Sequence, residues 1–167
     1  RSWLLRKLHA ERAMPWGADP RAFDPLAAVQ TARRVGMLFG DHRYFRLDVR
    51  GLDDLPPPPV MLVSNHSGGT TVPDVWGFGV AWYRRFGAAR PLHFMTHEII
   101  LATGATGRYF ARRGALRASW TAARAAIALG RDVIVMPGGD LDAWRPHSRR
   151  YEVQFAGRVG YARLAVE

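Results

Sequence analysis

The chain has 167 residues, 48% of them hydrophobic, with a formal net charge of +10 and no cysteine. This length is typical of one globular domain with a core of its own. The lack of cysteine excludes disulfides, thiol nucleophiles and zinc sites built on cysteine. The positive charge comes almost entirely from arginine. It suits a partner that carries phosphates, and lipid headgroups, coenzyme A and nucleic acid all do.

The first helix is expected over residues 1–17. Its arginines and the apolar residues Trp3, Leu4 and Leu8 segregate loosely at helical spacing. This pattern is typical of a helix that lies in a membrane interface, and equally of a helix packed on its own domain. No run approaches the ~18 apolar residues that a spanning helix needs.

A second helix is predicted after Asp24. Asp24 is a good N-cap, Pro25 suits the first helical position, and Gly40 ends the pattern. We therefore divide the chain into an N-terminal helical segment, 1–42, and a following domain, 43–167.

The domain over 43–167 alternates predicted strands with predicted helices. Strands are expected at 44–49, 60–63, 91–95, 132–136 and 151–155. Helices are expected at 74–86, 97–103, 120–129 and 160–167. This alternation predicts an α/β fold with a mixed, largely parallel sheet flanked by helices.

Two of these strands end in loops rich in glycine and polar residues. The run MLV leads into SNHSGGTTVPD, and the run DVIVM leads into PGGDLDAWRPH. Sites in open α/β sheets collect at the carboxyl ends of strands, so both loops are candidates for a functional site.

In the first loop, His66 and Asp74 are the candidate catalytic pair. A loop with two glycines can fold back and bring the carboxylate to the imidazole, which then accepts a proton in a fixed orientation. The alternative is a surface histidine and an aspartate that only favours the helix N-terminus.

In the second loop, Gly138 and Gly139 allow a tight turn whose amides can bind an oxyanion. Arg145 is expected to bind a phosphate or carboxylate. Asp140 and Asp142 are interpreted as structural, with Arg145 as an available partner. The alternative is an ordinary surface turn.

Together the two loops resemble the conserved blocks of the glycerolipid acyltransferase superfamily, which includes lysophospholipid and monoacylglycerol/diacylglycerol acyltransferase-like enzymes. The first block is Asn65-His66 with Gly68, Gly69 and Pro73-Asp74, and the third is VIVMPGG at 133–139. The segment 110–130 stands at the place of the second block, with Gly114 at its glycine. The resemblance covers roughly residues 43–167.

The chain departs from the family pattern in three places. Seven residues separate His66 from Asp74, where four are commoner. Leu116-Arg117-Ala118 stands where members that act on phosphate-bearing acceptors usually carry an arginine, which leaves a neutral glyceride as a possible acceptor. The chain ends at Glu167, before the family's Val-Pro block, so the fold is expected to be truncated at its C-terminus.

The resemblance implies transfer of a fatty acyl group from acyl-CoA or acyl carrier protein to a glycerolipid hydroxyl. His66 would be the general base and Asp74 would orient it. Asn65, Gly68, Gly69, Gly114, Gly138, Gly139 and Arg145 would contact substrate. It implies no further cofactor, a membrane lipid and an acyl thioester as partners, and a cytoplasmic enzyme peripheral at the membrane.

Two other functions stay open. The same His/Asp pair can hydrolyse an acyl thioester, with water as the acceptor. A basic surface can also serve a non-catalytic membrane-binding module. Arg112, Arg113 and Arg117 form a basic cluster that suits coenzyme A phosphates, lipid headgroups or plain solvent. Nucleic acid is disfavoured because the arginines are spread along the chain without a recognised motif. His93, His97 and His147 lack ligand-like spacing, so no metal is expected.

Overall fold

The computed structural model describes residues 15–67 and 71–167, and every structural statement below refers to them. The predicted amphipathic helix over 1–17 falls almost entirely outside the described residues. Gly68 and Gly69 fall outside them as well.

Four parallel strands form one sheet in the order β1-β4-β2-β3. They are β1 (Met61–Val63), β2 (Leu92–Thr96), β3 (Ala115–Arg117) and β4 (Asp132–Val135). The predicted α/β fold with a largely parallel sheet is confirmed, and each described pair of strands is parallel. Because β4 enters between β1 and β2, the carboxyl ends of β1 and β4 are neighbours although about 70 residues separate them.

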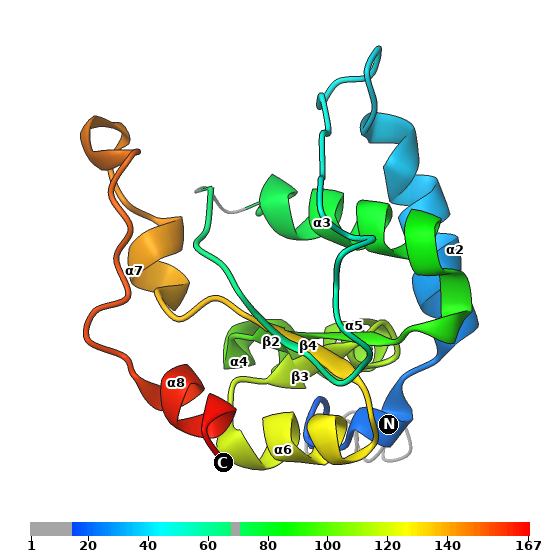
Figure 1. Ribbon diagram of the computed structural model, residues 1–167, viewed down its shortest axis with the longest axis vertical. Helices are drawn as coiled ribbons and strands as arrows, with labels where there is room; N and C mark the ends of the chain where they lie inside the picture. Colours follow the sequence, from blue (N-terminus) through cyan, green and yellow to red (C-terminus); the bar gives the residue numbers. More distant parts are fainter. Residues whose placement is uncertain (1–14, 68–70) are drawn as a thin grey trace, which may run out of the picture.

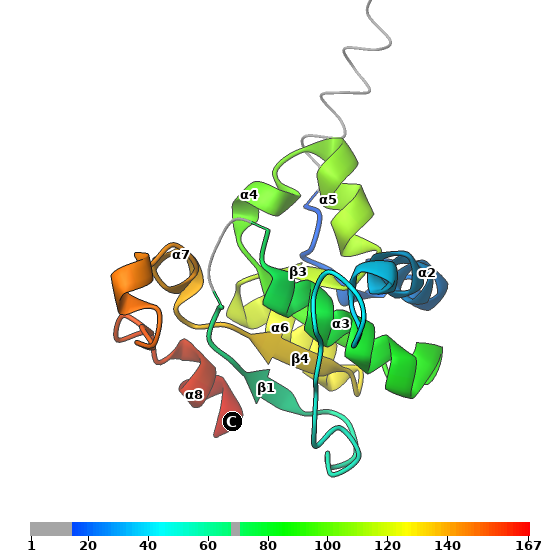
Figure 2. The same ribbon diagram turned by 90° about the horizontal axis from the view of Figure 1, so that it is seen from above.

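Helices cover both faces of this sheet. In Figure 1, α2 and α3 lie above it and α6 lies below it, while α7 and α8 lie at the side opposite α2 (Figures 1 and 2). The α-helices are α2 (Pro25–Val35), α3 (Pro73–Phe86), α4 (Glu98–Leu101), α5 (Gly104–Ala111), α6 (Trp120–Ala128), α7 (Gly139–Ala143) and α8 (Gly160–Ala165). Short 3₁₀ turns occur at η1 (Pro20–Ala22), η2 (Gly36–Leu38), η3 (Gly87–Ala89) and η4 (His147–Arg149).

The core is split into two layers by the sheet. Successive residues of a strand point to opposite faces, so Ile134 packs toward α2 and α3 while Val133 packs toward α6. The first layer contains Phe23, Ala28, Trp82, Tyr83, Leu92 and Ile134. The second contains Leu116, Ala122, Ala126 and Val133. A three-layer arrangement of this kind leaves the strand ends as the accessible edges of the sheet.

The predicted start of α2 is confirmed in detail. The Asp24 carboxylate accepts the amide of Ala27 at 3.1 Å, and Pro25 is the first helical residue. The helix ends at Val35 rather than Gly40, and η2 continues it for one tighter turn.

Two predicted strands are wrong. Residues 44–49 keep their inward and outward alternation, but they form only one isolated bridge, Phe39 to Phe45. Leu47 packs beside Gly77 of α3, so this segment lies on a helix instead of a strand. Residues 151–155 form a loop, in which the Gln154 amide donates to the Asp142 carboxylate at 3.3 Å.

Three of the strands and α-helices were not predicted, namely β3, α5 and α7. The strand β3 has only three residues, too few for a periodic signal. The helix α5 follows α4 almost at once, because Thr103 caps it by accepting the amide of Thr106. The segment predicted as one short helix over 97–103 is therefore α4, capped by His97, followed by the start of a second helix.

Candidate active site

The site is built where β1 and β4 end side by side. Val63 is paired with Val135, and the Ser64 amide then donates to the Val135 carbonyl at 3.0 Å. The two loops interpreted as functional from the sequence, one after each strand, thus begin next to each other. Both loops lie at the carboxyl ends of neighbouring strands, where ligands of open α/β sheets bind.

The first loop folds back and brings His66 and Asp74 together. The His66 Nδ1 lies 3.2 Å from the Asp74 Oδ2, and the same oxygen accepts the Ser67 amide at 2.9 Å. The two side chains are only 13% and 18% exposed. Asp74 is the second residue of α3, so a rigid helix positions the carboxylate.

The contacts of Asp74 keep it ionised. Burial on its own would raise the pKa of this carboxyl, but hydrogen bonds from the His66 ring and the Ser67 amide outweigh burial and hold the pKa below its usual value. A carboxylate at Nδ1 favours the tautomer that carries its proton there. The Nε2 of His66 is then the atom that can accept a proton.

Backbone strain marks the residue that leads into α3. Val72 is β-branched and has a φ of 40° and a ψ of 58°, in the left-handed region. Such a conformation costs on the order of 1–3 kcal/mol and is common next to functional sites. Its carbonyl accepts the amide of Val75 at 3.1 Å, so the strained residue starts the helix that presents Asp74.

The second loop meets the backbone of His66 through a buried ion pair. Asp142 is fully buried and Arg145 is 6% exposed on its side chain, and the two are paired. The Asp142 Oδ2 accepts the His66 amide at 2.5 Å, and the Arg145 Nη2 donates to the His66 carbonyl at 2.8 Å. The expected pairing of Asp142 with Arg145 is observed, whereas Asp140 pairs with Arg158.

This geometry does not support the prediction that Arg145 binds a substrate anion. Its charge is already matched by Asp142, and its second terminal nitrogen is bound to a carbonyl. The anchoring role of Asp142 toward His66 was missed from the sequence. The spacing of an aspartate and an arginine three residues apart, next to a glycine turn, is the signal that could have found it.

The glycines of the second loop serve packing and turning. A Cβ on Gly138 would lie 2.3 Å from the Asp142 Cβ, so only glycine lets that carboxylate approach. Gly139 has a φ of 52°, and its amide donates to the Met136 carbonyl at 3.1 Å. That amide is therefore used inside the turn.

Four further residues were predicted to contact substrate. Asn65 is exposed beside His66. Gly68 and Gly69 are not described. Gly114 precedes β3, at the opposite edge of the sheet from His66, and a Cβ there would lie 2.5 Å from the Leu92 carbonyl oxygen. Close packing against β2 explains why residue 114 is a glycine. The prediction that Gly114 contacts substrate does not fit this position.

The three arginines of the predicted basic cluster, Arg112, Arg113 and Arg117, each bind a different partner within the protein. Arg112 pairs with Asp24, and Arg113 donates to Thr31 at 2.7 Å. Arg117 donates to Glu98 at 2.9 Å and to the carbonyl of Trp16. These contacts hold the N-terminal segment to the sheet and explain all three residues without a phosphate ligand.

A cavity of about 1580 Å³ opens beside the His66 ring. Its walls are mainly apolar and include Val75, Trp76, Phe94 and Met136 near the site. Ile99, Leu141 and Trp144 line it and are also exposed to solvent, so they lie at its mouth. Its lining extends from Thr31 of α2 to Ala123 of α6, on both faces of the sheet, so the whole volume exceeds the 300–1,000 Å³ or so that a drug-sized ligand fills.

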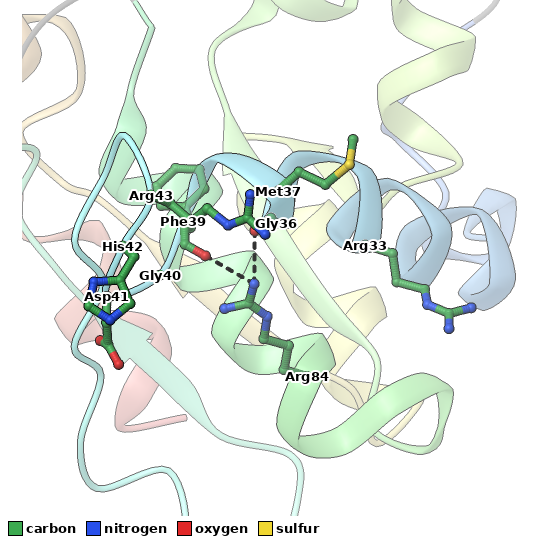
Figure 3. Close-up of a pocket in the computed structure, with 9 residues that line it drawn as sticks. All are labelled: Arg33, Gly36, Met37, Phe39, Gly40, Asp41, His42, Arg43 and Arg84. Atoms are coloured by element: carbon green, nitrogen blue, oxygen red, sulfur yellow. Dashed lines mark hydrogen bonds between the residues drawn. The ribbon is translucent and has the colours of Figure 1, made fainter.

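A second, shallower hollow of about 590 Å³ lies where α2 ends against α3. Figure 3 shows Arg84 pointing into it and donating to the carbonyls of Gly36 and Phe39, at 2.9 and 3.1 Å. The Gly36 carbonyl also accepts the Phe39 amide at 3.2 Å, and both carbonyls belong to the region where α2 and η2 end and helical partners run out. The arginine thus has a structural role as the C-terminal cap of α2.

Comparison of the chain with protein-family models, curated proteins and solved structures found no match. Within residues 15–67 and 71–167, no helix is long and apolar enough to cross a bilayer. The same residues contain no group of three or more histidines and carboxylates arranged to hold a metal ion.

Proposed function

We propose that the protein is an O-acyltransferase that moves a fatty acyl group from an acyl thioester to a glycerolipid hydroxyl. The observation that carries this proposal is the partly buried His66–Asp74 pair, whose histidine lines a large, mainly apolar cavity. Acyl-CoA and acyl carrier protein are the two candidate donors. The resemblance of the two loops to the acyltransferase blocks adds support from the sequence.

The chemistry begins with the acceptor hydroxyl. The Nε2 of His66 removes the hydroxyl proton as the oxygen attacks the thioester carbonyl carbon, and Asp74 stabilises the imidazolium that forms. The tetrahedral intermediate then collapses, the carbon–sulfur bond breaks, and the imidazolium returns its proton to the leaving thiolate. The products are an ester and a free thiol, and no covalent acyl-enzyme is required.

The cavity and its rim suit an amphipathic substrate. An acyl chain placed in the cavity replaces water against apolar walls, which stabilises binding by roughly 0.8 kcal/mol per buried CH₂ group. The exposed Ile99, Leu141 and Trp144 at its mouth, together with the net positive charge, favour contact with an anionic lipid surface. This supports peripheral association with a membrane.

An acyl-transfer assay tests the proposal. Purified protein is given acyl-CoA or acyl carrier protein with glycerol phosphate, lysophosphatidate, monoacylglycerol or diacylglycerol, and products are identified by mass spectrometry. We expect an acyl ester with at least one acceptor, and a rate about 10²–10⁴-fold lower for His66→Ala. His42→Ala, at an exposed histidine by the hollow at the end of α2, is the matched control and should keep the full rate.

The alternatives give different products. Free fatty acid with no ester, lost in His66→Ala, indicates a thioester hydrolase. Lipid-vesicle binding without turnover, unchanged in His66→Ala, indicates a non-catalytic module and contradicts the proposal.

A further inference from the structure

A buried ion pair contacts both peptide groups of the proposed catalytic histidine. Asp142 accepts the His66 amide at 2.5 Å, and Arg145 donates to the His66 carbonyl at 2.8 Å. The pair comes from the loop after β4, more than 70 residues away along the chain. The neighbouring backbone joins in, because the Gln154 amide donates to the same carboxylate at 3.3 Å.

Stability alone does not account for such a pair. Taking two charges out of water costs several kcal/mol per ion, and buried pairs are often no better for stability than apolar residues of the same size. Here the two charged side chains hydrogen-bond to the peptide groups on both sides of the His66 Cα atom. Holding both peptide groups fixes the position from which the His66 side chain departs.

The ring itself is held by a third contact. Asp74, from a different helix, engages Nδ1 at 3.2 Å. With the backbone held from α7 and the ring held from α3, the direction of Nε2 is determined. A misplacement of about 1 Å in a catalytic group can cost on the order of 10²-fold in rate, so this support matters for turnover.

We propose that Asp142 and Arg145 are positioning residues, which clamp the backbone of His66 so that its Nε2 faces the cavity. This inference rests on the proposed function for its kinetic consequence. Its structural content, that the pair immobilises residue 66, stands by itself. Gly138 is part of the same arrangement, since any side chain at this position would collide with Asp142.

The first test is amide hydrogen exchange of the full chain, read by NMR at His66. Asp142→Asn keeps the shape of the side chain and removes its charge. We expect the His66 amide to exchange at least about 10-fold faster in this variant, because it loses a charge-assisted acceptor. The Ile134 amide in the core should not change.

Glu152→Gln is the matched control. Glu152 and Arg149 form another acid–arginine pair three residues apart in the same part of the chain, but both are exposed. This variant should leave exchange at His66 unchanged. An unchanged His66 rate in Asp142→Asn as well would overturn the clamp.

The second test separates positioning from simple stability. In the acyl-transfer assay, Asp142→Asn should lower kcat about 10–100-fold, with KM for the acyl thioester within about twofold. Arg145→Lys keeps the positive charge but loses the several N–H donors of the planar guanidinium, so it should retain more activity than Arg145→Gln, which loses both. Equal losses in the two arginine variants, or a loss seen only in KM, contradict positioning.

The two proposals fail in distinguishable ways. If the wild type transfers no acyl group, the proposed function fails, while exchange at His66 still decides the clamp. If Asp142→Asn does not fold, hydrogen exchange of the wild-type protein tests the clamp instead. In the wild type, the His66 amide should exchange about 100-fold more slowly than the same amide in an unstructured peptide. Exchange at the peptide rate would overturn the inference.

Discussion

The amino ends and the carboxyl ends of the parallel strands, called here the amino edge and the carboxyl edge, each hold a histidine, a carboxylate and an arginine, but they arrange these groups differently. At the amino edge, Asp132 is fully buried and pairs with Arg90 at 2.5 Å. It also accepts the amide of Val60, just before β1, at 2.8 Å. At the carboxyl edge, Asp142 pairs with Arg145 and accepts the amide of His66, just after β1.

The histidines make the difference. At the amino edge, His93 is fully buried, its Nδ1 lies 3.2 Å from the Gly114 carbonyl oxygen, and its Nε2 faces Arg131. Both nitrogens are occupied, and the residue is not among those lining the large cavity. His66 has Nδ1 engaged by Asp74 and lines that cavity. The same residue types thus hold backbone at both edges, and only at the carboxyl edge do they place a histidine beside the cavity.

The largest expected effect on this comparison comes from Asp132→Ala. Removing the carboxylate leaves Arg90 buried without its partner and the Val60 amide without its acceptor. We expect a loss of about 3–5 kcal/mol in the free energy of unfolding. Denaturant titration measures it, with the exposed Asp48→Ala as control. A loss no larger than the control's would show that the amino edge does not depend on this pair.

Next in size is Asp74→Asn at the carboxyl edge. An amide in place of the carboxylate favours the wrong tautomer of His66, so acyl transfer should fall at least about 10²-fold. The lowered pKa of Asp74 keeps it ionised from about pH 5 to 8, so no change of pH in this range should restore the variant. In the wild type, ionised Asp74 stabilises the folded state, and this stabilisation is lost only as the pH falls through the lowered pKa of Asp74. Activity profiles of both proteins test this, and a rescue at any of these pH values contradicts it.

A smaller effect is expected from protonation at the amino edge. Burial, with the nearby Arg131 charge, lowers the pKa of His93 to about 4. Between the ordinary pKa of 6.5 and about 4, the unfolded chain binds a proton that the folded chain does not, so stability decreases as pH falls. From pH 7.5 to 5 this amounts to about 2 kcal/mol. Thermal melts should show a shallower pH dependence for His93→Gln, and identical slopes would contradict the account.

The smallest effect is expected where a similar pair is exposed. Arg85 and Asp53 pair near the amino edge, with side chains 53% and 73% exposed. Solvent screens such pairs, so Asp53→Asn should move Tm by no more than about 1 °C and leave acyl transfer intact. A large shift in Tm would show that exposure does not separate the two kinds of pair.

The sequence predicts local features well. The hydrophobic runs at 60–63 and 132–136 identify β1 and β4, because parallel strands tend to be continuously apolar. The expected burial is found for β4, whereas β1 is an edge strand and is only partly buried. Asp24 and Pro25 mark the start of α2 through chemistry confined to a few residues. The approach of His66 to Asp74 follows from a short loop, so it too is accessible to sequence reasoning.

Features that depend on distant partners are not predictable in this way. The pairing of Arg145 with Asp142, three residues away, is accessible from the sequence, but only the fold brings this pair to the backbone of His66, more than 70 residues away. Gly114 matches a motif, yet tertiary packing against Leu92 explains it. Residues 44–49 alternate like a strand, but a strand also needs a neighbour with free hydrogen-bonding groups, and this segment lies on α3.

The central claim is that His66, and not His93, performs chemistry. The most direct measurement is acyl transfer per folded molecule for His66→Ala and His93→Gln, side by side with wild type at pH 7.5. The account predicts a loss of about 10²–10⁴-fold for His66→Ala and a rate close to wild type for folded His93→Gln. Full activity in His66→Ala, or equal losses in both variants, would contradict it.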